Sequence, residues 1–480
     1  MVVLAVPFFW GLEGEEFHGD ESHWVTSGQE AWWLVTSGRW MDPEWREQFY
    51  FYSQPQVGKV VIGAALAVSG RYGPTRIYDY DWQLLPEENR AVGRVPPLGA
   101  VMAGRVPGAI AGWAGCLLVW AMAGRVGMPS GAGPLAGVLL ASQPLWLANA
   151  RRVGLDELAL VLGVGAALMV GEGVRRRRWV WWVAAGVAAG LAVGTKYVGV
   201  LAVLGGLAFV VGTQGPALCA PPPSARAFTR PSQARDDQGG AVDVRRVAVG
   251  GLVALLAGVL VFVGANPALY ADPWEQVRVS VGFLTYQAEG MRATIPEFGS
   301  PLWVGVEIVD RVFWPLGFPH VVEGSMREPL VPGTYGTPII ALGAVLGLTF
   351  LRRVRGGGVA VWALVVYVAL VLSLPTWWER WHLPLVLPLT LLAGAGLCAL
   401  PRGRWWLSPA LALAGAQYVG ALALLPSYLG KGFGQLVMQP LGAVAHVAAL
   451  AYALVTLVSL ALHRRAYAGP ARQPLPRRAA

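Results

Sequence analysis

The sequence predicts an all-α, polytopic membrane protein with about 11–13 transmembrane helices. Of its 480 residues, 55% are hydrophobic and only 14% carry a charge, whereas about a quarter of residues are charged in an average soluble domain. The mean hydropathy is +0.50. The apolar residues form long runs separated by short arginine-rich breaks, which is the pattern of a chain that crosses a bilayer many times.

We expect the apolar helices at about residues 1–12, 106–124, 132–150, 157–172, 179–194, 197–212, 247–265, 337–351, 358–374, 383–400, 406–425 and 441–462. The first run is shorter than the roughly 20 residues that a spanning helix needs, and no Lys or Arg precedes it as in a signal peptide. We therefore expect that the given start cuts into the first helix. A helix that enters the bilayer at a shallow angle is the alternative.

The arginines orient these helices. If the spans alternate in direction, the clusters all fall on one side: Arg125, Arg175 to Arg178, Arg226 to Arg246, Arg352 to Arg355, Arg402 to Arg404 and Arg464 to Arg478. The positive-inside rule makes that side cytoplasmic. The sequence thus predicts a multi-pass protein of the cytoplasmic (inner) membrane.

The same orientation divides the chain into regions. We expect one membrane domain over residues 1–465, with extracytoplasmic segments at 13–105 and 266–336 that include helices lying in the bilayer interface. A Pro- and Arg-rich stretch, 212–245, is predicted to be a disordered cytoplasmic linker. Residues 466–480 form a basic cytoplasmic tail.

The net charge of +9 does not indicate a nucleic-acid partner, because the arginines cluster between apolar runs, as topology signals do. The expected partners are membrane lipids and a membrane-borne substrate. Three cysteines, Cys116, Cys219 and Cys398, lie in or beside apolar segments without paired spacing. They are predicted to be small core residues.

The first outer segment places two adjacent carboxylates, Asp20 and Glu21, just after the first apolar run. Residues 22–38 mix aromatic and polar side chains, as in a helix resting on the bilayer surface. The apolar stretch Ser53–Gly70 follows and is expected to dip into the interface and return. These elements predict an outer vestibule with an acid at its base.

Cations border the apolar runs on the same side. Lys59 and Lys196 lie outside, against the positive-inside bias, and Asp156 lies at another outer turn. Ionisable groups at membrane depth cost several kcal/mol unless they are paired or functional, which indicates a shared polar site. Guanidinium and ammonium groups gathered there suit a phosphate. The candidate cations are Lys59, Arg105, Arg151, Lys196 and Arg380.

Five short motifs occur in order: Asp-Glu at 20–21, Pro-x-x-Gly-Lys at 55–59, Arg-Val-Pro at 105–107, Arg-x-x-x-x-Asp at 151–156 and Arg-Trp-x-x-Pro at 380–384. Together they resemble the membrane glycosyltransferases of the GT-C type, in the branch of the protein O-mannosyltransferases and lipid A aminoarabinose transferases (glycosyltransferase family 39). The resemblance implies the GT-C fold and the transfer of a sugar from a polyprenyl-phosphate carrier to a hydroxyl or phosphate on the extracytoplasmic side.

By this resemblance, Asp20 is the general base that activates the acceptor, Asp156 is a second acid of the site, and Lys196 and Arg380 contact the carrier phosphate. Glu21 is the remaining candidate catalytic acid. A positioned base contributes about 10²–10⁴ in rate, and a departing phosphate needs nearby positive charge. No clear carboxylate nucleophile is evident, which favours direct displacement with inversion.

The sequence also departs from this family. Ser53-Gln54-Pro55 stands where the family often has His-Pro-Pro or Glu-Lys-Pro. A metal ligand that the family sometimes supplies at this place is therefore missing. The sequence leaves open whether the protein binds a divalent cation. Residues 71–93 look like an insertion. The sugar and the acceptor, which is a protein, a lipid or a wall polymer, are therefore left open.

Simpler interpretations compete with these roles. In these interpretations, Asp20 and Glu21 are solvated charges at the end of a helix. Asp156 and Glu157 form the N-terminal cap of the following helix, and Arg151 is an interfacial arginine. A secondary transporter that uses Asp156 and Lys196 as coupling groups is the alternative function, although transporters usually show internal repeats. A non-catalytic membrane scaffold is the third possibility.

Overall fold

All regular structure that we describe is helical, as the sequence predicts. The computed structural model describes residues 2–15, 17–73, 77–218, 244–294, 300–313, 338–350, 357–373 and 379–398, together with residues 415 and 418. Several expectations lie outside these ranges: the spans at 406–425 and 441–462, most of the linker, Cys219 and the basic tail.

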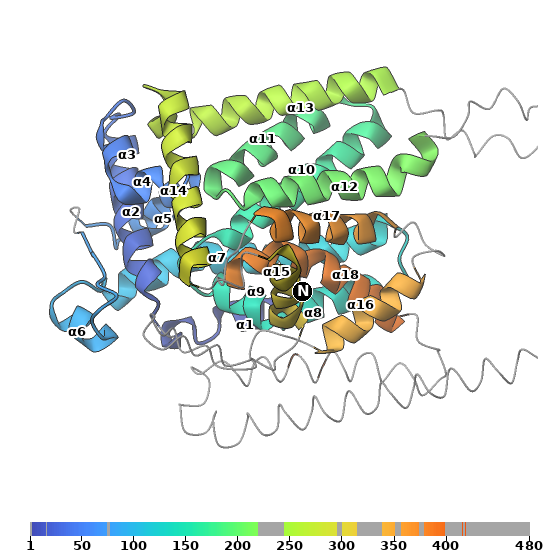
Figure 1. The fold of residues 1–480 in the computed structure, drawn as a ribbon, viewed down its shortest axis with the longest axis horizontal. Coiled ribbons are helices and arrows are strands. Elements are labelled where there is room, and N and C mark those ends of the chain that lie inside the picture. The colour runs from blue at the N-terminus through green and yellow to red at the C-terminus, as the bar shows by residue number, and fades with distance from the viewer. Residues whose placement is uncertain are drawn as a thin grey trace, which may run out of the picture.

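The N-terminal part forms short helices. They are α1 (Val2–Phe9), η1 (Leu12–Gly14), α2 (Gly19–Thr36), α3 (Glu44–Glu47), α4 (Phe49–Tyr52), α5 (Val57–Val68) and α6 (Pro86–Ala91). Helices α2 to α6 gather at one end of the molecule, on the left in Figure 1. This end is the predicted extracytoplasmic side and is called the outer end below.

The longer helices follow. They are α7 (Leu98–Arg125), α8 (Ala132–Ala141), α9 (Pro144–Ala150), α10 (Asp156–Arg176), α11 (Trp179–Thr195), α12 (Gly199–Leu218) and α13 (Val244–Gly264). In Figure 1, α10 to α13 lie side by side and roughly parallel. The outer end of this layer therefore holds the start of α10, the end of α11 and the end of α13.

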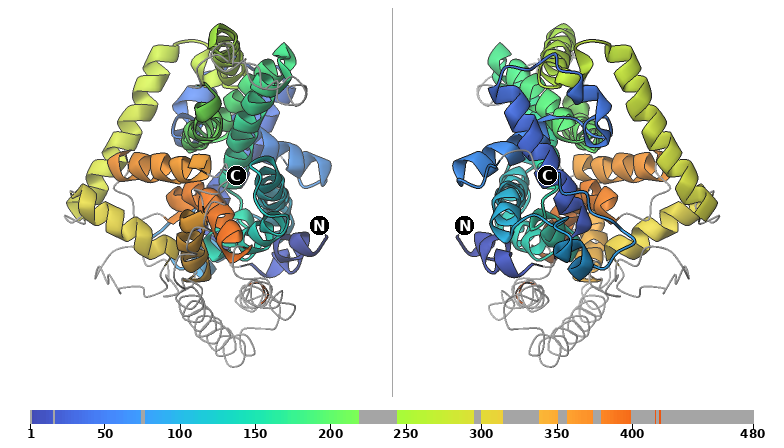
Figure 2. Two further views of the ribbon diagram at one scale, coloured as in Figure 1. Left: turned by 90° about the vertical axis from the view of Figure 1, so that its right-hand side faces the viewer. Right: turned by 90° about the vertical axis from the view of Figure 1, so that its left-hand side faces the viewer.

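The remaining described helices complete the bundle. They are η3 (Pro267–Leu269), α14 (Pro273–Thr294), α15 (Pro301–Phe313), α16 (Pro338–Phe350), α17 (Gly357–Ser373), η6 (Glu379–His382) and α18 (Leu383–Cys398). Helix α18 packs against α8, α16 and α17. Figure 2 shows α14 and α15, in lime and yellow, along one flank of the molecule.

Three described helices are long and apolar enough to cross a membrane: α7, α10 and residues Arg245–Gly264 of α13. Eight shorter apolar helices of 10–17 residues accompany them. Most predicted spans coincide with these helices within a few residues. The molecule is thus a multi-pass membrane protein by its helix composition and its fold.

Three expectations about the spans are wrong. The second span begins at Leu98 rather than near 106, because no helix-breaking residue interrupts the small residues that precede Arg105. The predicted span at 132–150 is broken into α8 and α9 at Ser142–Gln143, where Pro144 starts a new helix. Residues 212–218 belong to α12 and not to the linker.

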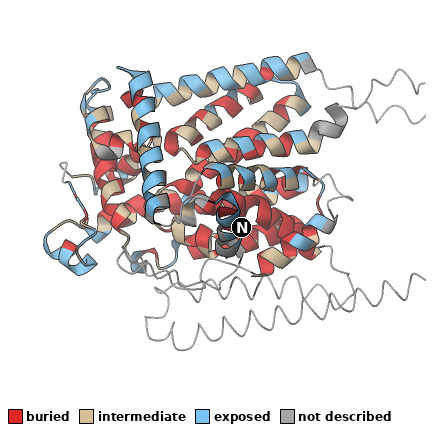
Figure 3. Ribbon diagram, viewed as in Figure 1, coloured by how far each residue is buried: buried red, intermediate tan, exposed pale blue. Residues whose placement is uncertain are grey.

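Close packing of α11 on α13 depends on small residues. A Cβ atom at Gly186 would lie 2.2 Å from the carbonyl oxygen of Ala254, and one at Gly190 would lie 2.4 Å from that of Gly258. Such small residues allow two helix backbones to approach closely, as in membrane helix pairs. Figure 3 shows the opposite surface of α13 as largely exposed, consistent with contact with lipid.

Helix α2 does not rest on the bilayer surface as expected for residues 22–38. It packs against α5, and Val25, Ala31 and Leu34 along it are fully buried. At one point a Cβ atom on Gly63 of α5 would lie 2.2 Å from the carbonyl oxygen of Gly28. The two helices are in backbone contact there, so α2 is a core element that holds its first turn in a fixed place.

Candidate active site

Asp20 lies in the first turn of α2. The sequence His18-Gly-Asp-Glu21 forms a capping box: the His18 Nδ1 accepts a hydrogen bond from the Asp20 backbone N–H (3.2 Å), and the Glu21 carboxylate accepts one from the His18 backbone N–H (3.0 Å). A helix N-terminus favours a negative charge. The local sequence therefore fixes the position of Asp20 in the first turn of α2.

Asp20 forms an ion pair with Arg380 of η6, 360 residues further along the chain. Both side chains remain about a quarter exposed, at 27% and 26%. Burial by itself would raise the pKa of Asp20, but the charges of Arg380, His18 and Lys196 outweigh it and lower that pKa well below its usual value. The arrangement holds an ionised carboxylate beside a guanidinium group.

Lys196 and Asp156 form the second pair. The Lys196 Nζ donates to the Asp156 Oδ2 at 2.6 Å, and both side chains are nearly buried. Asp156 starts α10 and Lys196 follows the end of α11, while the ammonium group lies 5.2 Å above the ring of Trp24 in α2. The charges of Lys196, Asp20 and Arg380 act on one another. Four expected site residues thus lie together at the outer end.

Arg105 and Arg151 lie in a different setting. The Arg105 guanidinium binds both oxygens of Glu21 at 2.8 Å and donates to the carbonyl oxygens of Leu12 and Glu15. Both arginines and Glu21 are 1% exposed or less. Their hydrogen-bonding groups are directed at protein partners, so the structure does not bring these three residues to the Asp20–Arg380 pair.

Arg151 binds the same turn, residues 10–15 after α1, through other partners. Its guanidinium binds the Glu15 carboxylate at 2.7 Å and donates to the carbonyl oxygens of Pro7, Trp10 and Gly11. Arg151 and Arg105 therefore fasten the turn after α1 to the bundle. That turn leads directly into α2, so the two arginines position Asp20 from a distance.

Lys59 is fully buried near the start of α5. Its ammonium group donates to the carbonyl oxygen of Gln54 at 2.6 Å and to the Gln56 side chain at 3.2 Å, and it lies over the ring of Phe51. Within the described ranges no carboxylate pairs with it. Gly58, its neighbour, packs against the backbone of Thr195, so Lys59 lies close to the Lys196 turn.

Sequence reasoning missed one residue of this neighbourhood. Trp24 follows Asp20 by four positions and so lies on the same face of α2, a spacing that was available in the sequence. Glu157 was expected beside Asp156 at the outer turn, either as a cap of α10 or as a member of the polar site. It is fully buried, and neither carboxylate oxygen has a hydrogen-bond partner among the described residues.

No metal site is evident in the described part of the chain, where no three His, Cys, Asp or Glu side chains gather as ligands would. The loop at Ser53-Gln54-Pro55 supplies no such ligand either. Cys116 is buried, as predicted. The candidate site is therefore one of carboxylates and cations.

An apolar cavity of about 390 Å³ lies between α10, α11, α12 and α13. Its lining runs along α11 from Trp182 to Val193, about 16 Å for eleven helical steps. Val193 and Val200, at the outer end of the lining, flank the turn that carries Lys196. An apolar space thus leads along the helices to the charged cluster.

Comparison with known proteins places this fold in a class. Residues 100–225, which include Arg105, Arg151, Asp156 and Lys196, match the family model described as dolichyl-phosphate-mannose-protein mannosyltransferase. A comparison with the curated proteins finds no match.

Two solved structures share the fold over 95% of this chain and 75% of theirs. They are crystal structures of ArnT from Cupriavidus metallidurans, one bound to undecaprenyl phosphate (18% identity, TM-score 0.51) and one in the apo state (16% identity, TM-score 0.50). At these identities the likeness establishes the fold. The chain has the all-helical GT-C fold, as the sequence predicts.

Proposed function

We propose that this protein transfers a sugar from a polyprenyl-phosphate carrier to an acceptor on the extracytoplasmic side of the inner membrane. The observation that carries the proposal is the Asp20–Arg380 pair with Lys196 beside it, at the outer end of a GT-C fold. The family match and the likeness to a protein bound to undecaprenyl phosphate support it. The chemistry needs one carboxylate and a cationic clamp, and both lie here.

Lys196 and Arg380 bind the carrier phosphate in this proposal. Each holds a carboxylate in the structure and can exchange it for the phosphate, which guanidinium and ammonium groups bind well. Lys59 is fully buried and donates to Gln54 and Gln56, so it takes a positioning role and does not add to the clamp. Arg105 and Arg151 also take a positioning role, because their donors are engaged. The apolar cavity beside Lys196 accommodates part of the carrier tail.

Asp20 acts as the general base. An acceptor oxygen attacks the anomeric carbon of the sugar, and its proton passes to the Asp20 carboxylate. The bond from the anomeric carbon to the phosphate oxygen breaks, and the carrier phosphate leaves with the electron pair towards Lys196 and Arg380. Glu21 is bonded to Arg105 through both oxygens and positions α2. A single displacement therefore inverts the anomeric configuration.

Donor binding also tunes the base in this scheme. A carboxylate with a strongly lowered pKa is a weak base, because proton transfer follows Brønsted behaviour. When Arg380 turns to the phosphate, it no longer lowers the pKa of Asp20 as strongly. Asp20 thus becomes a better base only when a donor is present.

The test uses the full chain in lipid nanodiscs and a panel of radiolabelled polyprenyl-phosphate sugars. Asp20→Asn should lower sugar release from the donor about 10²–10⁴-fold. The matched control is Asp42→Asn, because Asp42 also pairs with an arginine, Arg39, beyond the other end of α2. Equal activity of the two variants would contradict the role of Asp20. Solute flux in proteoliposomes without donor cleavage would favour the transporter with Asp156 and Lys196 as coupling groups.

A further inference from the structure

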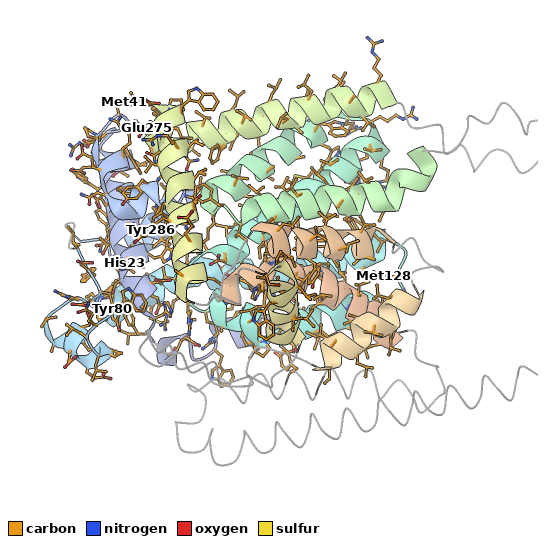
Figure 4. All side chains as sticks on the ribbon, in the orientation of Figure 1. His23, Met41, Tyr80, Met128, Glu275 and Tyr286 are labelled. Carbon is orange, nitrogen blue, oxygen red and sulfur yellow. The ribbon has the colours of Figure 1, made fainter. Side chains whose placement is uncertain are left out.

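Residues 77–97, the segment that leads from α5 to α7, fold against the first half of α2. The Tyr78 backbone N–H donates to the Thr26 hydroxyl at 2.9 Å, and the Ser22 hydroxyl donates to the Arg94 carbonyl oxygen at 3.0 Å. Figure 4 labels Tyr80 in this segment, beside the end of α2 that carries Asp20. The segment that we expect to be an insertion thus contacts the first half of the helix that carries the candidate base.

The loop at residues 81–85 is held rigidly by one buried side chain. The Asn89 amide oxygen accepts from the Asp81 backbone N–H at 2.9 Å, and its amide nitrogen donates to the carbonyl oxygens of Asp81, Leu84 and Leu85. Arg94 pairs with the Asp81 carboxylate at 2.8 Å. A loop fixed in this way presents its side chains without an ordering cost on binding.

Trp82 is the side chain that this loop presents. Its ring meets the Tyr80 ring at 5.1 Å and the His18 ring at 5.7 Å between centroids, both edge to face. A Cβ atom on Gly19 would lie 2.7 Å from Trp82 and from Tyr80, so both rings press on the backbone that precedes Asp20. Tyr80 is 8% exposed but Trp82 remains 36% exposed. A supported aromatic ring is therefore left open beside the base.

We propose that Trp82 is an acceptor subsite, where the ring stacks on a neutral pyranose so that a hydroxyl of that sugar reaches Asp20. The proposal rests on the proposed function and names its acceptor class. A pyranose ring has apolar C–H faces and a polar rim, which an aromatic ring with polar neighbours matches.

Charge around Trp82 favours a neutral acceptor. The described residues of the segment carry four nearby acids against two arginines: Asp79, Asp81, Glu87, Glu88, Arg90 and Arg94. One of these arginines, Arg94, is already paired with Asp81. An acceptor that bears phosphates or carboxylates would meet like charge here, which is a common means of rejecting a wrong ligand. The subsite thus selects an uncharged glycan over a phosphorylated lipid.

An interfacial anchor is the other role of an exposed tryptophan in a membrane protein. Trp40 provides the control, because it is 41% exposed and lies beyond the opposite end of α2. If both tryptophans were only anchors, replacing Trp82 or Trp40 by alanine would have similar effects on membrane insertion and thermal stability. An acceptor subsite would distinguish Trp82 from Trp40 in substrate kinetics alone.

The experiment compares the wild type, Trp82→Ala, Trp82→Phe and Trp40→Ala in nanodiscs with a cleavable donor. The acceptor probes are methyl α-D-mannopyranoside, methyl β-D-glucopyranoside and a Ser/Thr peptide. Trp82→Ala should raise the KM for a methyl glycoside at least tenfold and leave the KM for the donor within about twofold, and Trp82→Phe should lie between. Trp40→Ala should match the wild type. Saturation-transfer NMR should lose the glycoside signal in Trp82→Ala.

Three results would overturn the subsite. They are glycoside transfer that Trp82→Ala leaves unaltered, equal losses in Trp82→Ala and Trp40→Ala, and transfer to the peptide alone. Failure of the proposed function has a different signature, which is that the wild type cleaves none of the polyprenyl-phosphate donors. The NMR binding measurement needs no donor, so it separates the two failures.

Discussion

Carboxylates pair with cations differently at the outer end of the helix bundle and at the opposite end, which is called the inner end below. At the outer end, four carboxylates each hold one cation: Asp20–Arg380, Asp156–Lys196, Glu21–Arg105 and Glu15–Arg151. At the inner end, one carboxylate, Glu172, faces three arginines of α7 and α10, namely Arg125, Arg175 and Arg176.

Burial separates the two ends further. The inner arginines are about half exposed, at 49%, 64% and 50%, around a Glu172 side chain that is 6% exposed, whereas both partners of the Glu21–Arg105 pair are 1% exposed. Exposed ion pairs contribute roughly 0–1 kcal/mol, but removing one partner of a buried pair costs about 3–5 kcal/mol. We therefore predict that the inner cluster acts through its number of positive charges, which the positive-inside rule counts. The outer pairs serve geometry, where each partner matters.

The largest effect should come from breaking a buried outer pair. Glu21→Gln removes the charge that faces Arg105 and weakens the bonds that Glu21 accepts from the backbone N–H groups of His18 and Val153. We expect a loss of about 3–5 kcal/mol. Thermal unfolding in one detergent should show a clearly lower midpoint. A midpoint like that of the wild type would mean that the pair does not hold α2 in place.

A smaller effect concerns the pH dependence of the outer end. In the free protein, Arg380 lowers the pKa of Asp20, so the stabilisation from this pair is present above the usual aspartate range and is lost only as the pH falls through the lowered pKa. Donor binding should weaken that effect. The acid limb of kcat, which reports the bound enzyme, should therefore lie at higher pH than the acid limb of kcat/KM.

That prediction is checked by initial-rate profiles between about pH 4 and 8 with the cleavable donor. We expect kcat/KM to stay level towards the acid end while kcat declines. Coincident limbs would show that Arg380 remains on Asp20 in the donor complex, contrary to the exchange that we propose.

The smallest effect should come from the inner cluster. Glu172→Gln removes the shared partner of three arginines that water already solvates. We expect a change below about 1 kcal/mol, further reduced by salt, in the same unfolding assay as Glu21→Gln. If the two variants lost equal stability, the contrast between the two ends would not be one of burial.

Parts of the site could be predicted and parts could not. The location of Asp20, Asp156, Lys196 and Arg380 at one end of the bundle followed from hydropathy and arginine clustering. The engaged state of Arg105 could not, because its partners are backbone carbonyl oxygens and Glu21, which come together only when the turn after α1 folds back on α7. Arg105 and Arg380 are both arginines, but packing engages Arg105 inside the protein and places Arg380 beside Asp20.

The sequence by itself determined the all-helical membrane class and most helix positions. The reason is that insertion of a segment into the bilayer depends on the hydropathy and charge of its own consecutive residues. Only the tertiary structure decided which carboxylate holds which cation. Asp20 and Arg380 are 360 residues apart, and apolar helices pack through shape and not through any local pattern. The placement of Trp82 beside Gly19 was decided in the same way.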